Sequence, residues 1–194
     1  LNPNELPQLD KINVQLKSLT GFQGIYVDGL EEASSFYKML ANRFFLFFYF
    51  IRDHKDINYT PAPDIVHDLY GHLPFFTDQK YADFCQKFGE MTCEFISEPE
   101  KMRQFERFFW FTIEFGLIKT SNGPRVFGAG IASSIGECIY ALSSEPVVIP
   151  FDIDKIRHQE FRIDVMQTQL FILENVEQLY ASLPELYRRV KEGL

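Results

Sequence analysis

Apolar residues recur at helical spacing along several long stretches of the chain. This pattern predicts a helix over Glu32–Ile51, and amphipathic to buried helices over Thr77–Cys93 and Lys101–Lys119. Ser133–Leu142 is also expected to be helical, and Val176–Glu192 is expected to form the last helix. Helices should therefore make up most of the fold.

Short β-elements are predicted between these helices. Strands are expected at Gly24–Val27, Val126–Phe127 and Val147–Phe151, with a turn at Ser121–Pro124. One further short helix is expected within the first 30 residues. Strands and helices do not alternate in a repeated βαβ pattern. The predicted fold class is therefore mainly α with small β elements.

The apolar run Phe44–Ile51 is the most membrane-like segment, but a spanning helix needs about 20 apolar residues. This run is much shorter and lies between Arg43 and Arg52, so we interpret it as a helix buried on all sides. No internal repeat or Pro/Gly/Ser-rich linker divides the chain. Residues 1–194 are therefore expected to form a single domain.

Composition limits the classes of function. Hydrophobic residues make up 46% of the 194 residues, and 21 of these are Phe, which suggests a core or pocket lined by rings. A net charge of -8 argues against nucleic acid and anionic membranes as partners. The cysteines Cys85, Cys93 and Cys138 have no spacing typical of disulfide frameworks or zinc knuckles, which favours a reducing cytoplasmic location. No signal peptide is visible in the sequence. Because the chain begins with Leu rather than Met, we expect it to be a fragment or a processed product.

Two histidines and one carboxylate are the candidate metal ligands. His67, His72 and Glu114 offer two imidazoles and a carboxylate, which is the ligand set of non-haem Fe(II) oxygenases. On an ideal helix, residues five positions apart lie roughly 140° apart, so His67 and His72 would not share a face. We predict that Gly71 ends the helix and brings His72 back beside His67. The spacing alone is weak evidence, because such histidines are often ordinary core or surface residues.

Glu114 is the stronger part of this hypothesis. It is the only charged residue between Arg107 and Lys119, and a buried carboxylate is costly unless it is paired or bound to metal. The alternative is a salt bridge to an arginine such as Arg52 or Arg125.

Two further acidic residues could contact and orient a metal ligand, but each also has a structural alternative. Asp64 precedes His67 and could orient its imidazole or cap the helix that ends near Gly71. Glu137 could be a partner of a metal ligand or a charge on a helix surface.

Three segments resemble the pterin-dependent aromatic amino acid hydroxylases. The first is Tyr59-Thr-Pro-Ala-Pro-Asp-Ile-Val-His-Asp-Leu-Tyr-Gly-His72-Leu-Pro, which is similar to the iron-binding segment of that family. Trp110-Phe-Thr-Ile-Glu-Phe-Gly-Leu117 and Phe127-Gly-Ala-Gly-Ile-Ala-Ser-Ser-Ile-Gly-Glu137 follow in the family's order and spacing. The similarity extends from about Leu6 through Pro150.

The resemblance implies roles for individual residues. It implies that the iron ligands are His67, His72 and Glu114. The positions that match pterin-binding residues are Gly29, Leu30, Phe36, Asp68 and Phe109. The positions that match substrate-binding residues are Arg52, Thr60, Pro63, Trp110, Phe115, Gly130 and Ser133. Departures occur at Asp68, Phe109 and Leu46, where the family usually or often carries Glu, Tyr and His respectively. From residue chemistry alone, simple core packing is the favoured interpretation of Phe36, Trp110 and Phe115.

The function implied by the resemblance is hydroxylation of an aromatic amino acid ring, using Fe(II), O2 and tetrahydrobiopterin or a related tetrahydropterin. Phenylalanine to tyrosine is the first choice, because Ile163 stands where tyrosine hydroxylases carry an acidic residue. Alternatives are a tryptophan 5-hydroxylase, or a truncated relative that binds iron and pterin without catalysis. A zinc hydrolase is disfavoured, since no H-E-x-x-H motif is present.

The resemblance also bears on the extent of the chain. The family's catalytic domain usually has a further N-terminal part, which this chain is expected to lack. No regulatory or tetramerisation domain is expected either, so a monomer or weak dimer is predicted.

Overall fold

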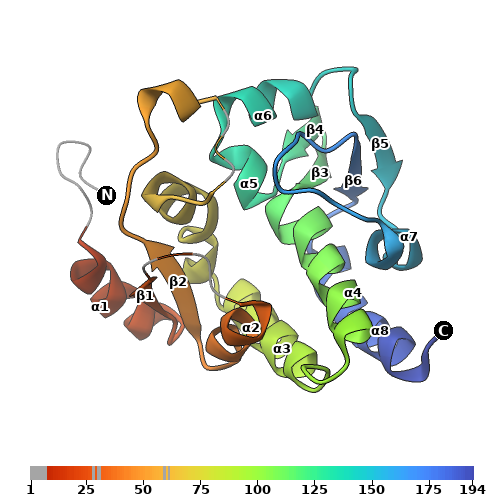
Figure 1. The fold of residues 1–194 in the computed structure, drawn as a ribbon, viewed down its shortest axis with the longest axis horizontal. Coiled ribbons are helices and arrows are strands. Elements are labelled where there is room, and N and C mark those ends of the chain that lie inside the picture. The colour runs from red at the N-terminus through yellow and green to blue at the C-terminus, as the bar shows by residue number, and fades with distance from the viewer. Residues whose placement is uncertain (1–7, 28, 30–31, 59, 61) are drawn as a thin grey trace.

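Helices make up most of the structure and two small sheets lie on either side of them (Figure 1). This computed structural model describes residues 8–27, 29, 32–58, 60 and 62–194. The α-helices in chain order are α1 (Leu9–Leu19), α2 (Ala33–Ala41), α3 (Gln79–Cys93), α4 (Pro99–Phe109), α5 (Ala129–Ala132), α6 (Ile135–Ala141), α7 (Ile153–His158) and α8 (Val176–Glu192). The other helical segments are the 3-10 turns η1 (His54–Asp56) and η3 (Phe75–Thr77) and the π-helical η2 (His67–His72) and η4 (Trp110–Glu114). The predicted fold class is confirmed.

The described strands form two sheets. In the first, β1 (Gln23–Val27) and β2 (Phe44–Phe48) run parallel and are joined through α2. The second has the order β4-β3-β6-β5 and is built from β3 (Gly116–Thr120), β4 (Gly123–Val126), β5 (Val147–Pro150) and β6 (Gln169–Leu173). Strands β3 and β4 form an antiparallel hairpin, whereas β6 runs parallel to both β3 and β5. Local β–α–β units are therefore present, although each strand is too short to produce a clear pattern in the sequence.

Two predicted helices end earlier than expected. Helix α2 stops at Ala41, Arg43 adopts a left-handed φ of 61°, and Phe44–Phe48 continues as strand β2. The prediction of a helix buried on all sides at Phe44–Ile51 is therefore wrong. Phe45, Phe47 and Phe48 are buried on strand β2, which pairs with β1, whereas Tyr49 and Phe50 are exposed. Aromatic residues suit a strand in this setting. No described helix is both long and apolar enough to span a membrane.

The second shortened prediction is Lys101–Lys119. Its helical part ends at Glu114, and Gly116–Thr120 forms strand β3 against β4 and β6. An apolar run of this kind suits a buried helix and a buried strand equally well, so periodicity does not locate the boundary. Strand β6 and helix α7 were not predicted.

Phenylalanine rings form much of the main core, as the composition predicted. Phe88 on α3 lies edge-on to Phe105 at 5.6 Å and stacks with Phe108 at 6.1 Å, both from α4. Helices α2 and α3 approach closely at Gly89, where a Cβ atom would lie 2.5 Å from the backbone nitrogen of Ala41. These contacts hold α2, α3 and α4 together beneath the metal-ligand candidates.

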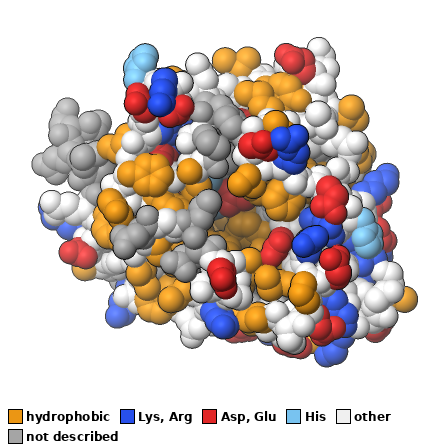
Figure 2. All heavy atoms as spheres, viewed as in Figure 1, with side chains coloured by type: hydrophobic (Ala, Val, Ile, Leu, Met, Phe, Trp, Pro, Cys, Tyr) orange, Lys and Arg blue, Asp and Glu red, His pale blue; other side chains and the backbone are white. Residues whose placement is uncertain are grey.

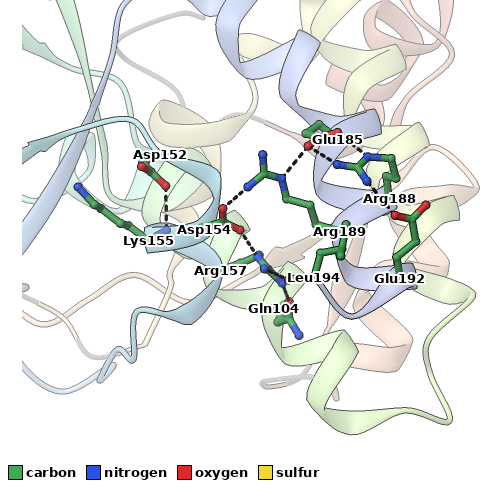
Figure 3. A network of polar contacts seen from close by, with 10 residues as sticks. All are labelled: Gln104, Asp152, Asp154, Lys155, Arg157, Glu185, Arg188, Arg189, Glu192 and Leu194. Atoms are coloured by element: carbon green, nitrogen blue, oxygen red, sulfur yellow. Dashed lines mark hydrogen bonds and ion pairs between the residues drawn. The ribbon is translucent and has the colours of Figure 1, made fainter.

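A polar network attaches α8 to α7 and α4 (Figure 3). Arg157, which is buried, donates to Asp154 at 2.8 Å and to Gln104 at 2.6 Å. Arg189 on α8 donates to Asp154 and, at 2.7 Å, to Glu185. The shared carboxylate of Asp154 thus links the last helix to the helix that precedes β6.

Candidate metal centre and adjoining cavity

Three side chains converge at one point in the structure. The Nε2 atoms of His67 and His72 lie 2.9 Å apart, and Glu114 oxygens lie 3.1 Å from His72 Nε2 and 3.6 Å from His67 Nε2. An ion with nitrogen and oxygen ligands at about 2.1 Å keeps neighbouring donor atoms roughly 3.0–3.4 Å apart. The three donors therefore fit adjacent positions around a single metal ion.

The π-helical segments explain how the sequence achieves this. Leu73 N–H donates to Asp68 O at 2.9 Å and Phe115 N–H donates to Trp110 O at 2.8 Å, both bonds spanning five residues. Such π-helical turns bring residues five positions apart onto the same side, and they are frequent at functional sites. The prediction that Gly71 ends the helix is therefore wrong, because the π-helix continues through His72.

Gly71 is instead a point of close approach. A Cβ atom there would lie 2.9 Å from both the Cβ and the carbonyl oxygen of Ala129 on α5. The backbone also approaches closely at Gly128, where an added Cβ atom would lie 2.2 Å from the carbonyl oxygen of Glu114. Helix α5 is thus packed directly on both π-helical segments.

The histidine rings are oriented by different neighbours. His67 Nδ1 lies 3.0 Å from Ser133 Oγ, which leaves Nε2 directed at His72 and Glu114. The His72 ring lies 4.5 Å from the Phe45 ring, and its buried Nδ1 has no hydrogen-bond partner among the described residues. Both rings therefore present Nε2 to the same point.

The protonation states also suit metal binding. Burial and the neighbouring charge of His72 lower the pKa of His67 to about 4, so its ring is neutral near pH 7. Burial opposes ionisation of Glu114, but His72 and His67 outweigh it and lower the pKa of this carboxyl. A neutral imidazole and an ionised carboxylate are the forms that bind metal.

The alternative salt bridges for Glu114 are not found among the described residues. Arg52 pairs with Asp64 at 2.6 Å, and Arg125 donates to the carbonyl oxygen of its neighbour Pro124. Among the described residues, the basic side chains that contact the Glu114 carboxylate are the two histidines alone. The metal-ligand interpretation of Glu114 is the one that the geometry supports.

Asp64 holds the start of the η2 region. Its carboxylate accepts from His67 N at 3.0 Å and from Arg52 at the backbone N, Nε and Nη2. Asp64 therefore caps this region, which is the structural alternative given for it above. It contacts the backbone of His67 rather than its ring. Ser133 is the residue that contacts the imidazole.

A cavity of about 410 Å³ lies beside the three ligand candidates. Figure 2 shows hydrophobic side chains gathered around a hollow on this face. The predicted site residues that line the cavity are Gly29, Phe36, Arg52, Thr60, Pro63, His67, Asp68, His72, Phe109, Trp110, Glu114, Phe115, Gly130, Ser133 and Glu137. Asp64 stands behind Arg52, and Leu30 lies outside the described residues.

Rings form two walls of this cavity. On one, Phe36 lies edge-on to Phe109 at 5.5 Å. On the other, Trp110 is stacked between Phe115 at 4.5 Å and Phe161 at 4.3 Å. A flat aromatic ligand could stack on or lie edge-on to either wall.

Several lining residues were not predicted as site residues. They are Val27, Ala33, Tyr37, Phe45, Phe48, Glu106, Ser134 and Phe161, together with Leu46 and Ile163, whose sequence signals concern departure from the family and substrate choice. Phe161 belongs to a segment with no regular pattern, so only its stacking on Trp110 reveals it. Glu106 lies among other charged residues of α4, including Arg103 and Arg107, so no signal in the sequence distinguishes it.

The polar groups of the cavity differ in how they are satisfied. Arg52 Nη1 donates to Ser133 O at 2.7 Å, and Asp68 accepts from Phe48 N at 2.7 Å. Burial raises the pKa of Asp68 to about 7. Glu137 is 1% exposed, so it is not a helix-surface charge, and both of its oxygens lack a hydrogen-bond partner among the described residues.

Two imidazoles and one carboxylate on a buried site, next to a cavity with aromatic walls, define a mononuclear non-haem metal protein. The comparison with protein families is more specific. Residues 1–193 match the model of the biopterin-dependent aromatic amino acid hydroxylases, and the chain belongs to this family.

Individual relatives agree with this assignment. The chain is 37% identical over 180 residues to the phenylalanine-4-hydroxylase of Caulobacter vibrioides, covering 92% of this chain and 61% of that protein. It is 35% identical over 179 residues to the corresponding protein of Pseudomonas aeruginosa, covering 92% and 68%. The chain thus spans about two thirds or less of the length of several curated relatives.

Solved structures are also similar. Phenylalanine hydroxylase from Legionella pneumophila has a TM-score of 0.87 at 37% identity, covering 99% of this chain and 84% of that one. The Chromobacterium violaceum enzyme with iron and phenylalanine bound has a TM-score of 0.86 at 32% identity, covering 98% and 70%. The fold prediction of a hydroxylase-like catalytic domain is confirmed.

Proposed function

We propose that this chain hydroxylates the ring of phenylalanine to give tyrosine, using Fe(II), O2 and a tetrahydropterin. The observation that carries the proposal is the convergence of His67, His72 and Glu114 at one edge of a cavity with aromatic walls. The names of the relatives support the same substrate. The metal, when bound, supplies the chemistry of oxygen activation.

The roles of the protein follow from the contacts of its residues. His67, His72 and Glu114 would hold the iron from one side, which leaves its other side toward the cavity for oxygen and substrate. The mainly apolar lining would exclude water, and the Trp110 wall would orient the substrate ring. Gly29, Phe36, Asp68 and Phe109 would bind the pterin, with Phe36 stacking on its ring.

Arg52 is proposed to bind the carboxylate of the amino acid. Its guanidinium has five N–H donors. Asp64 accepts from Nε and from Nη2, and Ser133 O accepts from Nη1. The remaining donors can form charge-assisted bonds to a ligand carboxylate, and the pair with Asp64 fixes their direction. Thr60, Pro63, Gly130 and Ser133 line the cavity with Arg52 and are proposed to complete this part of the substrate site.

The apolar side chain of Ile163 lines the same cavity and favours phenylalanine over tyrosine as substrate. Tryptophan 5-hydroxylation and iron or pterin binding without turnover are the alternatives. We further propose that residues 1–194 act as a single catalytic domain, as a monomer or weak dimer in the cytoplasm. The three cysteines are free thiols, in keeping with a reducing compartment.

The deciding experiment is anaerobic loading with Fe(II), followed by tetrahydrobiopterin and air, with Phe, Trp and Tyr offered together. Tyrosine formed from labelled Phe only when pterin is present would establish the proposed reaction. 5-Hydroxytryptophan as the main product would change the substrate assignment. Iron bound at one per chain with no product would refute catalysis by this chain and favour the non-catalytic alternative.

A further inference from the structure

Glu137 is a buried carboxyl group on the cavity wall that nothing else in the described structure uses. It lines the cavity, is 1% exposed, and neither oxygen has a hydrogen-bond partner among the described residues. Burial without a partner raises its pKa to about 7. A buried polar group left in this way is costly, which makes a structural role a poor explanation for it.

The local sequence offers an ordinary structural role, but the structure does not use it. Ser134-Ile-Gly-Glu137 reads as a capping box, in which the glutamate side chain would accept from the backbone N–H of Ser134. Only half of this motif forms, with Ser134 Oγ accepting from Glu137 N at 3.4 Å. The Ser134 N–H donates to Ile131 O at 3.1 Å instead, so the carboxyl of Glu137 remains free.

The other charged groups of the cavity are engaged or less buried. Arg52 pairs with Asp64, Asp68 accepts from Phe48 N, and the three ligand candidates contact one another. Glu106 also lacks an ion pair among the described residues, but it is only partly buried. Glu137 is therefore the buried acidic group that remains available to a ligand.

The position of Glu137 suits a contact with the ammonium group of an amino acid. Glu137 lies on α6, and the residue just before the N-cap of this helix is Ser133. The carbonyl oxygen of Ser133 accepts from Arg52 Nη1 at 2.7 Å. An amino acid bound by its carboxylate at Arg52 must place its ammonium group on the adjacent carbon. An ammonium group taken out of water needs an anionic partner, and Arg52 cannot provide one.

We propose that Glu137 binds the α-ammonium group of the amino acid substrate and so selects amino acids over the corresponding carboxylic acids. This inference rests on the proposed function, because it takes phenylalanine as the ligand. Arg52 and Glu137 together then complement both charges of the zwitterion.

The test measures binding of phenylalanine and of 3-phenylpropionate, which lacks the amine, to the anaerobic Fe(II)-loaded protein by calorimetry. The variant is Glu137→Gln, which keeps the volume of the side chain, and the matched control is Glu145→Gln at an exposed carboxylate. We expect Glu137→Gln to weaken phenylalanine binding about 10- to 100-fold while 3-phenylpropionate changes less than about threefold. Glu145→Gln should change neither.

A measurement on the unmodified protein keeps the proposal testable if Glu137→Gln does not fold. At pH 6 phenylalanine should release close to one proton on binding, measured in buffers of different ionisation enthalpy, because the ammonium group requires the ionised form of Glu137. 3-Phenylpropionate should release none. Equal proton release, or equal weakening of both ligands by Glu137→Gln, would overturn the assignment of Glu137 alone. Failure of the unmodified protein to bind either ligand would refute the proposed function, and this inference with it.

Discussion

Replacing Asp64 by alanine should damage both the stability of the protein and its metal centre. Asp64 is completely buried and accepts four hydrogen bonds, three from Arg52 and one from His67 N. The change removes the anionic partner of a guanidinium that is only 6% exposed. It also leaves the backbone N–H of a metal-ligand candidate without its partner.

The magnitude follows from this burial. Removing one partner of a buried ion pair costs about 3–5 kcal/mol, because the remaining charge is left uncompensated. For a domain of this size, about 1 kcal/mol shifts the Tm by roughly 2–4 °C, so Asp64→Ala should lower the Tm by about 6–20 °C. Loss of the hydrogen bond to His67 should weaken metal affinity by about 10- to 100-fold, as for other groups that position ligands.

The assay is urea denaturation of the metal-free protein, with Fe(II) affinity measured by anaerobic competition against a chelator. Asp83→Ala is the control, because the Arg43–Asp83 pair has its carboxylate 54% exposed and should contribute less than about 1 kcal/mol. The double variant Arg52→Met, Asp64→Ala should recover part of the lost stability, since it leaves no unpaired charge. If Asp64→Ala and Asp83→Ala cost the same, the argument from burial is wrong.

Three other predictions test the site and its surroundings. Glu114→Ala should abolish iron retention at one per chain, measured by elemental analysis after dialysis; retained stoichiometry would remove Glu114 from the ligand set. Gly128→Ala should destabilise the protein and weaken metal binding together, because the new Cβ would lie 2.2 Å from the Glu114 carbonyl oxygen, whereas Gly123→Ala, with nothing within 4 Å but φ +91, should affect stability alone. In the metal-free protein, Glu137→Gln should raise the free energy of unfolding, relative to the unmodified protein, by more at pH 8 than at pH 5. The raised pKa of about 7 means that the folded state holds its proton while the unfolded state loses it above about 4.5, so stability falls as pH rises through this window. The difference between the two pH values should be about 2 kcal/mol in urea titrations, and a pH-independent difference would contradict it.

The sequence predicted most of the helices but not all of their ends. Val176–Glu192 was placed with its observed boundaries, because its amphipathic pattern is long and Asn175 and Gly193 cap it. Phe44–Phe48 is predicted as part of a helix, but it forms strand β2, which pairs with β1. Apolar residues without periodicity are compatible with either element, and only the neighbouring strand decides between them.

The chemistry of the site was determined by the sequence alone. The residue types at His67, His72 and Glu114 specify a non-haem metal set, and the isolation of Glu114 among apolar residues indicates that it needs a cationic partner. Tertiary structure decided how these groups meet. The π-helical turn η2 aligns His67 and His72, which an ideal α-helix would keep apart. Helix α5 packs against both η2 and η4, the segment that carries Glu114. It also decided which polar groups are satisfied. Arg52 donates to Ser133 O in a distant segment of the chain, whereas the buried carboxyl of Glu137 has no partner among the described residues.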